Sequence, residues 1–123
     1  MIPDTSSIIF AFENKKNIFD IIEQEFVHPS ISISRGILRE LNSAASNKGR
    51  KGAAARAALL VAKAKKLKVY NNNGHVDAWI VGIARSSGGK VAIVTNDVAL
   101  AKRLAGFNGL LVCKVSREGK LRQ

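Results

Sequence analysis

The sequence is short of several residue types, and each shortage narrows the classes of protein that it can encode. Among its 123 residues Cys113 is the only cysteine, so no internal disulfide can form, and we expect this thiol to fill the core in a reducing cytosol. No apolar run approaches about 18 residues, and the N-terminus lacks the basic and small-residue pattern of a signal peptide. We therefore expect a cytoplasmic protein that has no membrane partner.

Aromatic and acidic residues are also scarce. Aromatic side chains make up 6% of the sequence and do not alternate with basic clusters, which argues against binding single strands by base stacking. Nine acidic residues stand against 20 basic ones, and the resulting net charge of +11 favours a polyanion bound through its backbone phosphates. A membrane surface or a highly charged exterior would fit the same composition, so charge alone leaves these alternatives open.

Short apolar runs alternate with amphipathic stretches along the chain. This alternation is typical of a parallel sheet that is covered by helices on both faces. With 46% hydrophobic residues and no repeat or linker, residues 1–123 are expected to form a single domain. The strands are expected at 1–4, 30–34, 68–70, 91–95 and 109–115. The helices are expected at 7–14, 17–26, 35–46, 53–67, 76–87 and 97–106.

Four carboxylates occur where such a sheet gathers its ligands. Asp4 follows the first predicted strand and Asp97 follows the fourth, whereas Asp77 and Glu40 lie within about a turn or so of a helix N-terminus. Ligands of open α/β sheets bind beyond the carboxyl ends of the strands, so the four side chains are candidates for one site. Each has a structural alternative: the three aspartates occupy positions typical of helix caps, and Glu40 suits a solvated surface.

A cluster of four carboxylates requires protons or a cation. Two carboxylates about 4 Å apart repel each other by about 4 kcal/mol at an effective dielectric of 20. Oxygen ligands suit Mg²⁺ or Mn²⁺, and the two histidines and one cysteine show no spacing typical of zinc ligands. If the four acids converge, the sequence therefore predicts an Mg²⁺ or Mn²⁺ site.

The ordered motifs "PDTS", "ILREL", "HVDAWIVGIA" and "VAIVTNDVAL" together resemble the PIN domain, a small nuclease fold, over essentially the whole chain. The resemblance implies a three-layer, Rossmann-like α/β/α sandwich with a mostly parallel sheet of about five strands. It also implies an endoribonuclease that uses Mg²⁺ or Mn²⁺ and leaves 5′-phosphate and 3′-hydroxyl ends. The catalytic and metal-binding acids that it implies are Asp4, Glu40, Asp77 and Asp97.

The same resemblance assigns supporting roles to two hydroxyl groups. Thr95 would orient Asp97 or a water on the metal, and Ser6 would donate a hydrogen bond from behind the acids. Charge suggests a further set, the cations that flank the Glu40 helix and its exit turn. These candidates for RNA binding are Arg35, Arg39, Lys48, Arg50 and Lys51. For any single one of them, a solvated surface position is the alternative.

The motifs depart from the family pattern at two acids. Many members pair acids at the third position and add one after the fourth, whereas Val76 and Ala78 flank Asp77 here and Val98 follows Asp97. One firmly held ion, with another recruited by the substrate phosphate, is therefore the expectation.

Family members suggest several biological settings. Some are nucleases of ribosomal-RNA maturation, which the "TND" motif and the basic charge favour, with rRNA or tRNA as substrate. Others are VapC-type toxin ribonucleases, which would require an antitoxin partner. Since the family often dimerises, a homodimer is also expected. A non-catalytic RNA- or ribosome-binding module that kept the fold is the alternative from another class.

Overall fold

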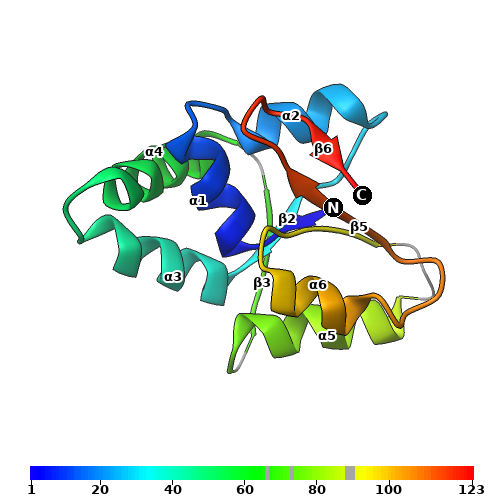
Figure 1. Cartoon of the computed structure of the whole chain (residues 1–123). Helices are drawn as coiled ribbons and strands as arrows, with labels where there is room; N and C mark the ends of the chain where they lie inside the picture. The colour runs from blue at the N-terminus through cyan, green and yellow to red at the C-terminus, as the bar shows by residue number, and fades with distance from the viewer. Residues whose placement is uncertain (66, 73, 88–90) are drawn as a thin grey trace.

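The computed structural model describes residues 1–65, 67–72, 74–87 and 91–123, in which strands and helices alternate as predicted (Figure 1). The helices in these ranges are α1 (Thr5–Glu13), α2 (Ile18–Glu25), α3 (Arg35–Ala45), α4 (Arg50–Ala64), α5 (Val76–Ser86) and α6 (Val98–Leu104). The strands are β1 (Ile2–Pro3), β2 (Ser32–Ser34), β3 (Lys68–Tyr70), β4 (Ala92–Val94), β5 (Leu111–Val115) and β6 (Leu121–Arg122). Each predicted helix and strand is present, and β6 is additional.

The strands pair in two sets. β1, β4, β5 and β6 form one sheet in that order, in which only the β5–β6 pair is antiparallel. β2 and β3 form a parallel pair, and Ser32 N donates a hydrogen bond to Met1 O at 2.9 Å between the two sets. Because Pro3 lies opposite Val94 in the β1–β4 register, the next residues, Asp4 and Thr95, also come together.

Helices cover the strands on both sides, as expected for a three-layer α/β/α sandwich. Figure 1 shows α1, α3 and α4 on one side and α5 and α6 on the other, with α2 beside the β5–β6 hairpin. The core between them contains fully buried branched side chains such as Ile8 of α1 and Ile93 of β4, each worth about 1.5–3 kcal/mol when buried. Cys113 is buried on β5, as predicted for a core residue. Among the described residues, no helix has the length and apolar character to cross a bilayer.

Capping side chains determine where the helices around the sheet ends begin. Asp4 caps α1, Ser34 caps α3 and Asp97 caps α6, each by accepting a hydrogen bond from a backbone N–H of the first turn. The N-cap of α5 is His75, which forms no side-chain cap. The expectation that Asp77 caps this helix is therefore wrong: Asp77 lies in the first turn, where the positive end of the helix dipole favours an acid.

Candidate active site

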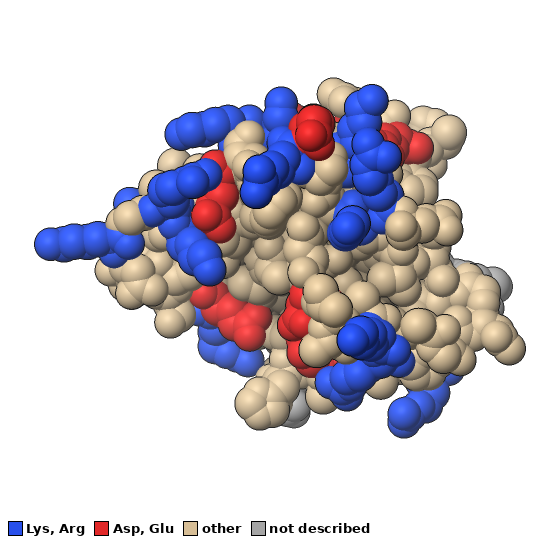
Figure 2. Space-filling view, in the orientation of Figure 1, with Lys and Arg blue, Asp and Glu red and all other residues tan. Residues whose placement is uncertain are grey.

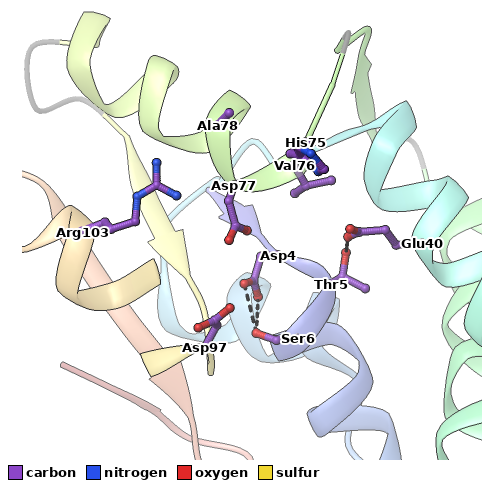
Figure 3. Close-up of a pocket in the computed structure, with 10 residues that line it drawn as sticks. All are labelled: Asp4, Thr5, Ser6, Glu40, His75, Val76, Asp77, Ala78, Asp97 and Arg103. Carbon is purple, nitrogen blue, oxygen red and sulfur yellow. Dashed lines mark hydrogen bonds between the residues drawn. The ribbon is translucent and has the colours of Figure 1, made fainter. Parts of the chain in front are cut away.

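A pocket of about 500 Å³ opens where β1 and β4 end and α1, α5 and α6 begin (Figure 3). Figure 3 shows three carboxylates, those of Asp4, Asp77 and Asp97, directed toward a common space, with Glu40 standing apart beside Thr5. All four predicted acids thus line one pocket. Among the described residues, however, no three acidic, histidine or cysteine side chains are close enough to form a ready-made metal-binding group. The four acids thus share one pocket, but their side chains are not packed into a compact set of metal ligands within the described residues.

Asp4 is the most firmly held of these acids. It is 4% exposed, and its carboxylate accepts hydrogen bonds from Ser6 Oγ at 2.8 Å, Ser7 N at 2.9 Å and Thr95 Oγ1 at 2.5 Å. Burial raises the pKa of Asp4, and these donors partly offset the effect by stabilising the charged form. No lysine or arginine in the described part of the chain pairs with it. Hydrogen bonds alone therefore compensate its charge.

Two backbone amides fix the direction of the hydroxyl protons around Asp4. Asp97 N donates to Thr95 Oγ1 at 3.0 Å, and Asn96 N donates to Ser6 Oγ at 3.0 Å. Each hydroxyl has a single proton, and since its oxygen already accepts from an amide, that proton is directed to Asp4. The hydroxyl of Thr95 therefore orients the side chain of Asp4 and the backbone of Asp97, rather than the side chain of Asp97.

The two carboxylate oxygens of Asp97 have different surroundings. Its Oδ1 accepts hydrogen bonds from Ala99 N at 2.9 Å and Leu100 N at 3.2 Å, which caps α6. Its Oδ2 accepts no hydrogen bond from any described residue, and the half-buried side chain lines the pocket. The helix-cap interpretation and the site interpretation of Asp97 are thus compatible, because each uses its own oxygen.

Asp77 and Glu40 enter the pocket from helices. Asp77 is half-buried in the first turn of α5. Glu40 is exposed on α3 and accepts a hydrogen bond from Thr5 Oγ1, as the dashed line in Figure 3 shows. Glu40 is therefore both a surface residue and a pocket residue, and its link to Thr5 joins α3 to the first turn of α1.

Asn72 sets α3 against the loop that leads to α5. It is 7% exposed; its Oδ1 accepts from Gly36 N at 2.8 Å, and its Nδ2 donates to Gly74 O at 3.1 Å. A Cβ on Gly36 would lie 2.7 Å from Asn72 Nδ2 and 3.0 Å from Val76 Cγ2, so only glycine permits this approach. The contact fixes the helices of Glu40 and Asp77 relative to each other. Sequence reasoning overlooks Asn72 because nothing in "NNNG" distinguishes it from its neighbours.

Among the residues that the structure describes, one arginine or lysine reaches the acidic pocket. The exposed residue Arg103, on α6, lines it, and Figure 3 shows its guanidinium on the Asp77 side. His75 lines the pocket at the start of α5. The sequence offered little signal for Arg103, because Lys102 precedes it and the pattern of "VALAKRL" alone does not indicate which of the two cations faces the acids.

The five cations predicted to bind RNA lie outside this pocket. All of them are exposed. Arg39 shares a shallow hollow with Glu40, so it lies next to the acids. Arg50 and Lys51 belong to the first turn of α4 rather than to the loop before it, and Arg50 lines a separate groove. These residues thus surround the α3–α4 side of the molecule, at varying distances from the acids.

The fold and the arrangement of acids at the sheet ends define the class of protein. The sequence profile of the PIN-like domain family matches residues 1–116, and the chain belongs to this family, as its motifs predicted. A solved structure with a similar fold is that of the PIN domain endonuclease Utp24, with a TM-score of 0.78 and 21% sequence identity. The likeness covers 98% of this chain and 89% of that one, and at this identity it concerns the fold. No protein of curated function has a significantly similar sequence.

Proposed function

We propose that this protein is a metal-dependent endoribonuclease that hydrolyses RNA phosphodiester bonds with Asp4, Glu40, Asp77 and Asp97. The observation that carries the proposal is the meeting of four acids, from four separate segments, in one pocket at the ends of β1 and β4. Membership of the PIN-like family supports a nuclease role, and the name of the Utp24 neighbour describes an endonuclease. The net charge of +11 favours a polyanionic substrate, for which we propose rRNA or tRNA in the cytoplasm.

The donor set of the pocket fits a hard divalent cation. Four carboxylates supply oxygen ligands, which Mg²⁺ and Mn²⁺ prefer, and the buried charge of Asp4 has no cationic partner among the described residues. Asp4, Asp77 and Asp97 would hold the ion, and Glu40 would extend the set toward the substrate. Such an ion supplies Lewis acidity, which activates water and offsets the negative charge that develops on the phosphate.

The protein residues then have separate tasks. The hydroxyls of Ser6 and Thr95 favour the charged form of Asp4 and fix its orientation, since each directs its proton to this carboxylate. Asp97 has a free Oδ2 with which it would bind the ion, and a carboxylate of the pocket would take the proton from the attacking water as a general base. Water adds to phosphorus, the bond to the 3′ oxygen breaks, and that oxygen takes up a proton. The products are a 5′-phosphate and a 3′-hydroxyl.

Arg103 is positioned to bind the phosphate that flanks the scissile bond, because it is the one arginine or lysine among the described residues that line the acid pocket. An Arg103→Ala variant should therefore raise KM for RNA. Its neighbour Lys102 is equally exposed, lies outside the pocket and provides the charge-matched control, Lys102→Ala. Equal KM values for the two variants would remove Arg103 from the site.

The decisive experiment incubates the purified protein with labelled single-stranded and structured RNA, including rRNA and tRNA fragments, with Mn²⁺, Mg²⁺ or EDTA. Cleavage should require the ion and should be lost in Asp77→Asn and Asp97→Asn. Glu118→Gln, which changes a fully exposed acid outside the pocket, should cleave normally. Full cleavage in EDTA would refute metal dependence. Salt-sensitive RNA binding without cleavage under every condition would instead indicate the non-catalytic module.

The proposal also covers a second copy of the chain, an antitoxin and a precursor rRNA as partners, and each can be tested separately. We infer a homodimer from the habit of the family, and size-exclusion chromatography with light scattering measures it directly. A toxin role would require an antitoxin, so expression of the protein alone should then arrest cell growth in an Asp97-dependent manner. A role in rRNA maturation predicts accumulation of a precursor when the Asp97→Asn protein replaces the wild type.

A further inference from the structure

We propose that a second groove, at the other end of α1 from the acids, binds the phosphate backbone of the RNA strand that occupies the active site. This inference rests on the proposed function for the identity of the polyanion. The groove has a volume of about 620 Å³ and runs between the α1–α2 connection and the first half of α4. Its polar lining consists of Glu13, Lys15, Lys16, Asn17 and Arg50, with Phe12 and alanines of α4 as apolar walls.

The charge of the groove suits a phosphate backbone. Three cations and one carboxylate, Glu13, line it, and none of these cations forms an ion pair with a residue that the structure describes. Arg50 instead donates a hydrogen bond to the backbone oxygen of Glu13 at 3.3 Å, which holds its guanidinium at the groove. Figure 2 shows lysine and arginine side chains gathered over α4 and the α1–α2 connection, on the face that also shows the carboxylates below them.

The placement of two cations on α4 also points to an anion. Arg50 and Lys51 occupy the first turn of this helix, which contains no acid and begins at Gly49 without a side-chain cap. The positive end of a helix dipole favours acids, so cations at this position are unfavourable without a compensating charge. A phosphate group in the adjoining groove supplies that charge.

Lys15 has a backbone conformation that a lysine does not favour. Its φ is 60°, in the left-handed region, where glycine and asparagine are preferred. The turn is closed by backbone bonds from Lys15 N to Phe12 O at 3.1 Å and from Lys16 N to Ala11 O at 2.9 Å, which do not depend on the side chain. The turn therefore does not require a lysine here, and the Lys15 side chain is available to the groove that it lines.

The side chain of Lys16 packs against the turn between β5 and β6. A Cβ built on Gly119 would lie 3.1 Å from Lys16 Cδ and 3.2 Å from Cγ, so the turn between β5 and β6 supports the methylene stem. A long side chain that is supported along its stem loses less freedom when its charged end binds a ligand. Lys16 is thus a partly preorganised contact for phosphate.

The spacing of the two sites defines the length of RNA that can use both. α1 has nine residues, so at about 1.5 Å per residue its two ends are about 14 Å apart. This distance corresponds to about four stacked nucleotides at roughly 3.4 Å each. A four-nucleotide RNA whose central bond lies at the acids extends only about two nucleotides, roughly 7 Å, to either side, and should therefore occupy the acid pocket alone. A 12-nucleotide strand should reach both sites.

The test variant combines Lys15→Asn, Lys16→Met and Arg50→Gln. Asparagine accepts the left-handed conformation at position 15, and methionine keeps the stem at position 16, so these two changes should preserve the fold. Arg50→Gln removes one exposed hydrogen bond to Glu13 O, and the variant should still fold. The charge-matched control combines Lys63→Met, Arg85→Gln and Lys102→Met, which are exposed and outside the groove. Thermal unfolding of both proteins confirms folding before any binding is measured.

Binding of a 12-nucleotide RNA is measured by fluorescence anisotropy with EDTA, in proteins that also contain Asp97→Asn. The groove variant should bind about tenfold more weakly or worse, with a salt slope reduced by roughly two, since each lost phosphate contact contributes about 0.7. An unchanged affinity, or an equal loss in the control, would overturn the proposal. So would equally tight binding of a polyglutamate peptide, which would indicate an acidic protein partner.

Cleavage by proteins with an intact Asp97 separates this proposal from the proposed function. The groove variant should show a raised KM for the 12-nucleotide RNA with unchanged kcat, and should cleave a four-nucleotide RNA as the wild type does. An equal loss of cleavage on both RNAs would overturn the proposal that the groove binds RNA. If the wild type cleaves neither RNA, the nuclease proposal fails while the anisotropy result still decides whether the groove binds RNA.

Discussion

Thr95 Oγ1 donates a 2.5 Å hydrogen bond to Asp4 Oδ2 across 91 positions of sequence. This bond joins the end of β4 to the end of β1. The same Thr95 oxygen also accepts a hydrogen bond from Asp97 N. One hydroxyl thereby connects two of the acids proposed for catalysis. The fold and the site share this group, so its removal should affect both.

A Thr95→Val variant keeps the shape of the side chain and removes the hydroxyl. It leaves the carboxylate of Asp4 and the amide of Asp97 each short of a partner, at a cost of about 1–3 kcal/mol for the buried Asp4 and less for the part-buried amide. The free energy of unfolding in urea should fall accordingly, and cleavage should fall by about 10–100-fold, as for the loss of an outer-shell partner of a metal site. Thr95→Ser retains the hydroxyl and should restore most of both. A Thr95→Val protein as stable as wild type would contradict this role of the Thr95 hydroxyl.

Substitutions of Asp97 should separate capping from chemistry. Asp97→Asn and Asp97→Ser retain an oxygen that can cap α6, whereas Asp97→Ala should cost about 1 kcal/mol of stability. All three should reduce cleavage by more than the roughly 10–100-fold expected for an outer-shell partner. Urea unfolding and initial rates on one RNA measure the two effects. Parallel losses of stability and rate across the series would mean that Asp97 acts only as a cap.

The buried carboxylate of Asp4 predicts a pH-dependent stability difference. An acid whose pKa is higher in the folded state contributes stability that is fully present below its unfolded pKa, about 3.9, and lost as the pH rises through the folded pKa. An Asp4→Asn variant has no such titration. Its free energy of unfolding, measured in EDTA relative to that of the wild type, should therefore improve as the pH rises above about 3.9 and level off once the pH exceeds the folded pKa of Asp4. A difference that is constant with pH would show that burial does not raise the pKa of Asp4.

Gly36→Ala should impair the site without touching an acid. The new Cβ would displace the Asn72 amide, which would break its bond with Gly36 N and move α3 relative to α5. We expect a loss of about 1–3 kcal/mol, the overpacking range, together with reduced cleavage. The matched control is Gly82→Ala in α5, where no atom lies within 4 Å of the new Cβ. Alanine there should raise stability by about 0.8–1 kcal/mol and leave cleavage unchanged.

The elements of this fold could be predicted because most of them carry their own pattern. The apolar periodicity of α2, α3 and α5 and the continuous apolar run of β4 are local signals that packing then reinforces. β6 has only two residues, Leu121 and Arg122, which form no recognisable alternation. Its pairing with β5 depends on the turn at Gly119, whose φ of 82° becomes evident only in three dimensions.

Asp4 and Asp97 could be proposed from their positions at strand ends, and Asp77 and Glu40 from their positions near helix starts, but the hydrogen-bond partners of these acids could not be predicted. The family resemblance implied that Thr95 orients Asp97 or a water on the metal, whereas the β1–β4 register brings its hydroxyl to Asp4. Asn96 was not identified, although its amide exchanges two hydrogen bonds with the backbone of Val115 at 2.9 and 3.0 Å. Such partners depend on which strands become neighbours, and no local pattern records that order.

The unequal use of the two oxygens of Asp97 bears on how such a protein can change over time. An amide at this position would still begin the helix, so a one-residue exchange would silence the proposed chemistry while the chain continues to fold. Asp4 cannot be replaced as easily, since both of its carboxylate oxygens accept hydrogen bonds at the junction of β1 and β4. Descendants that have become pure binders should therefore first show a neutral residue at position 97, with the acid at position 4 retained for longer.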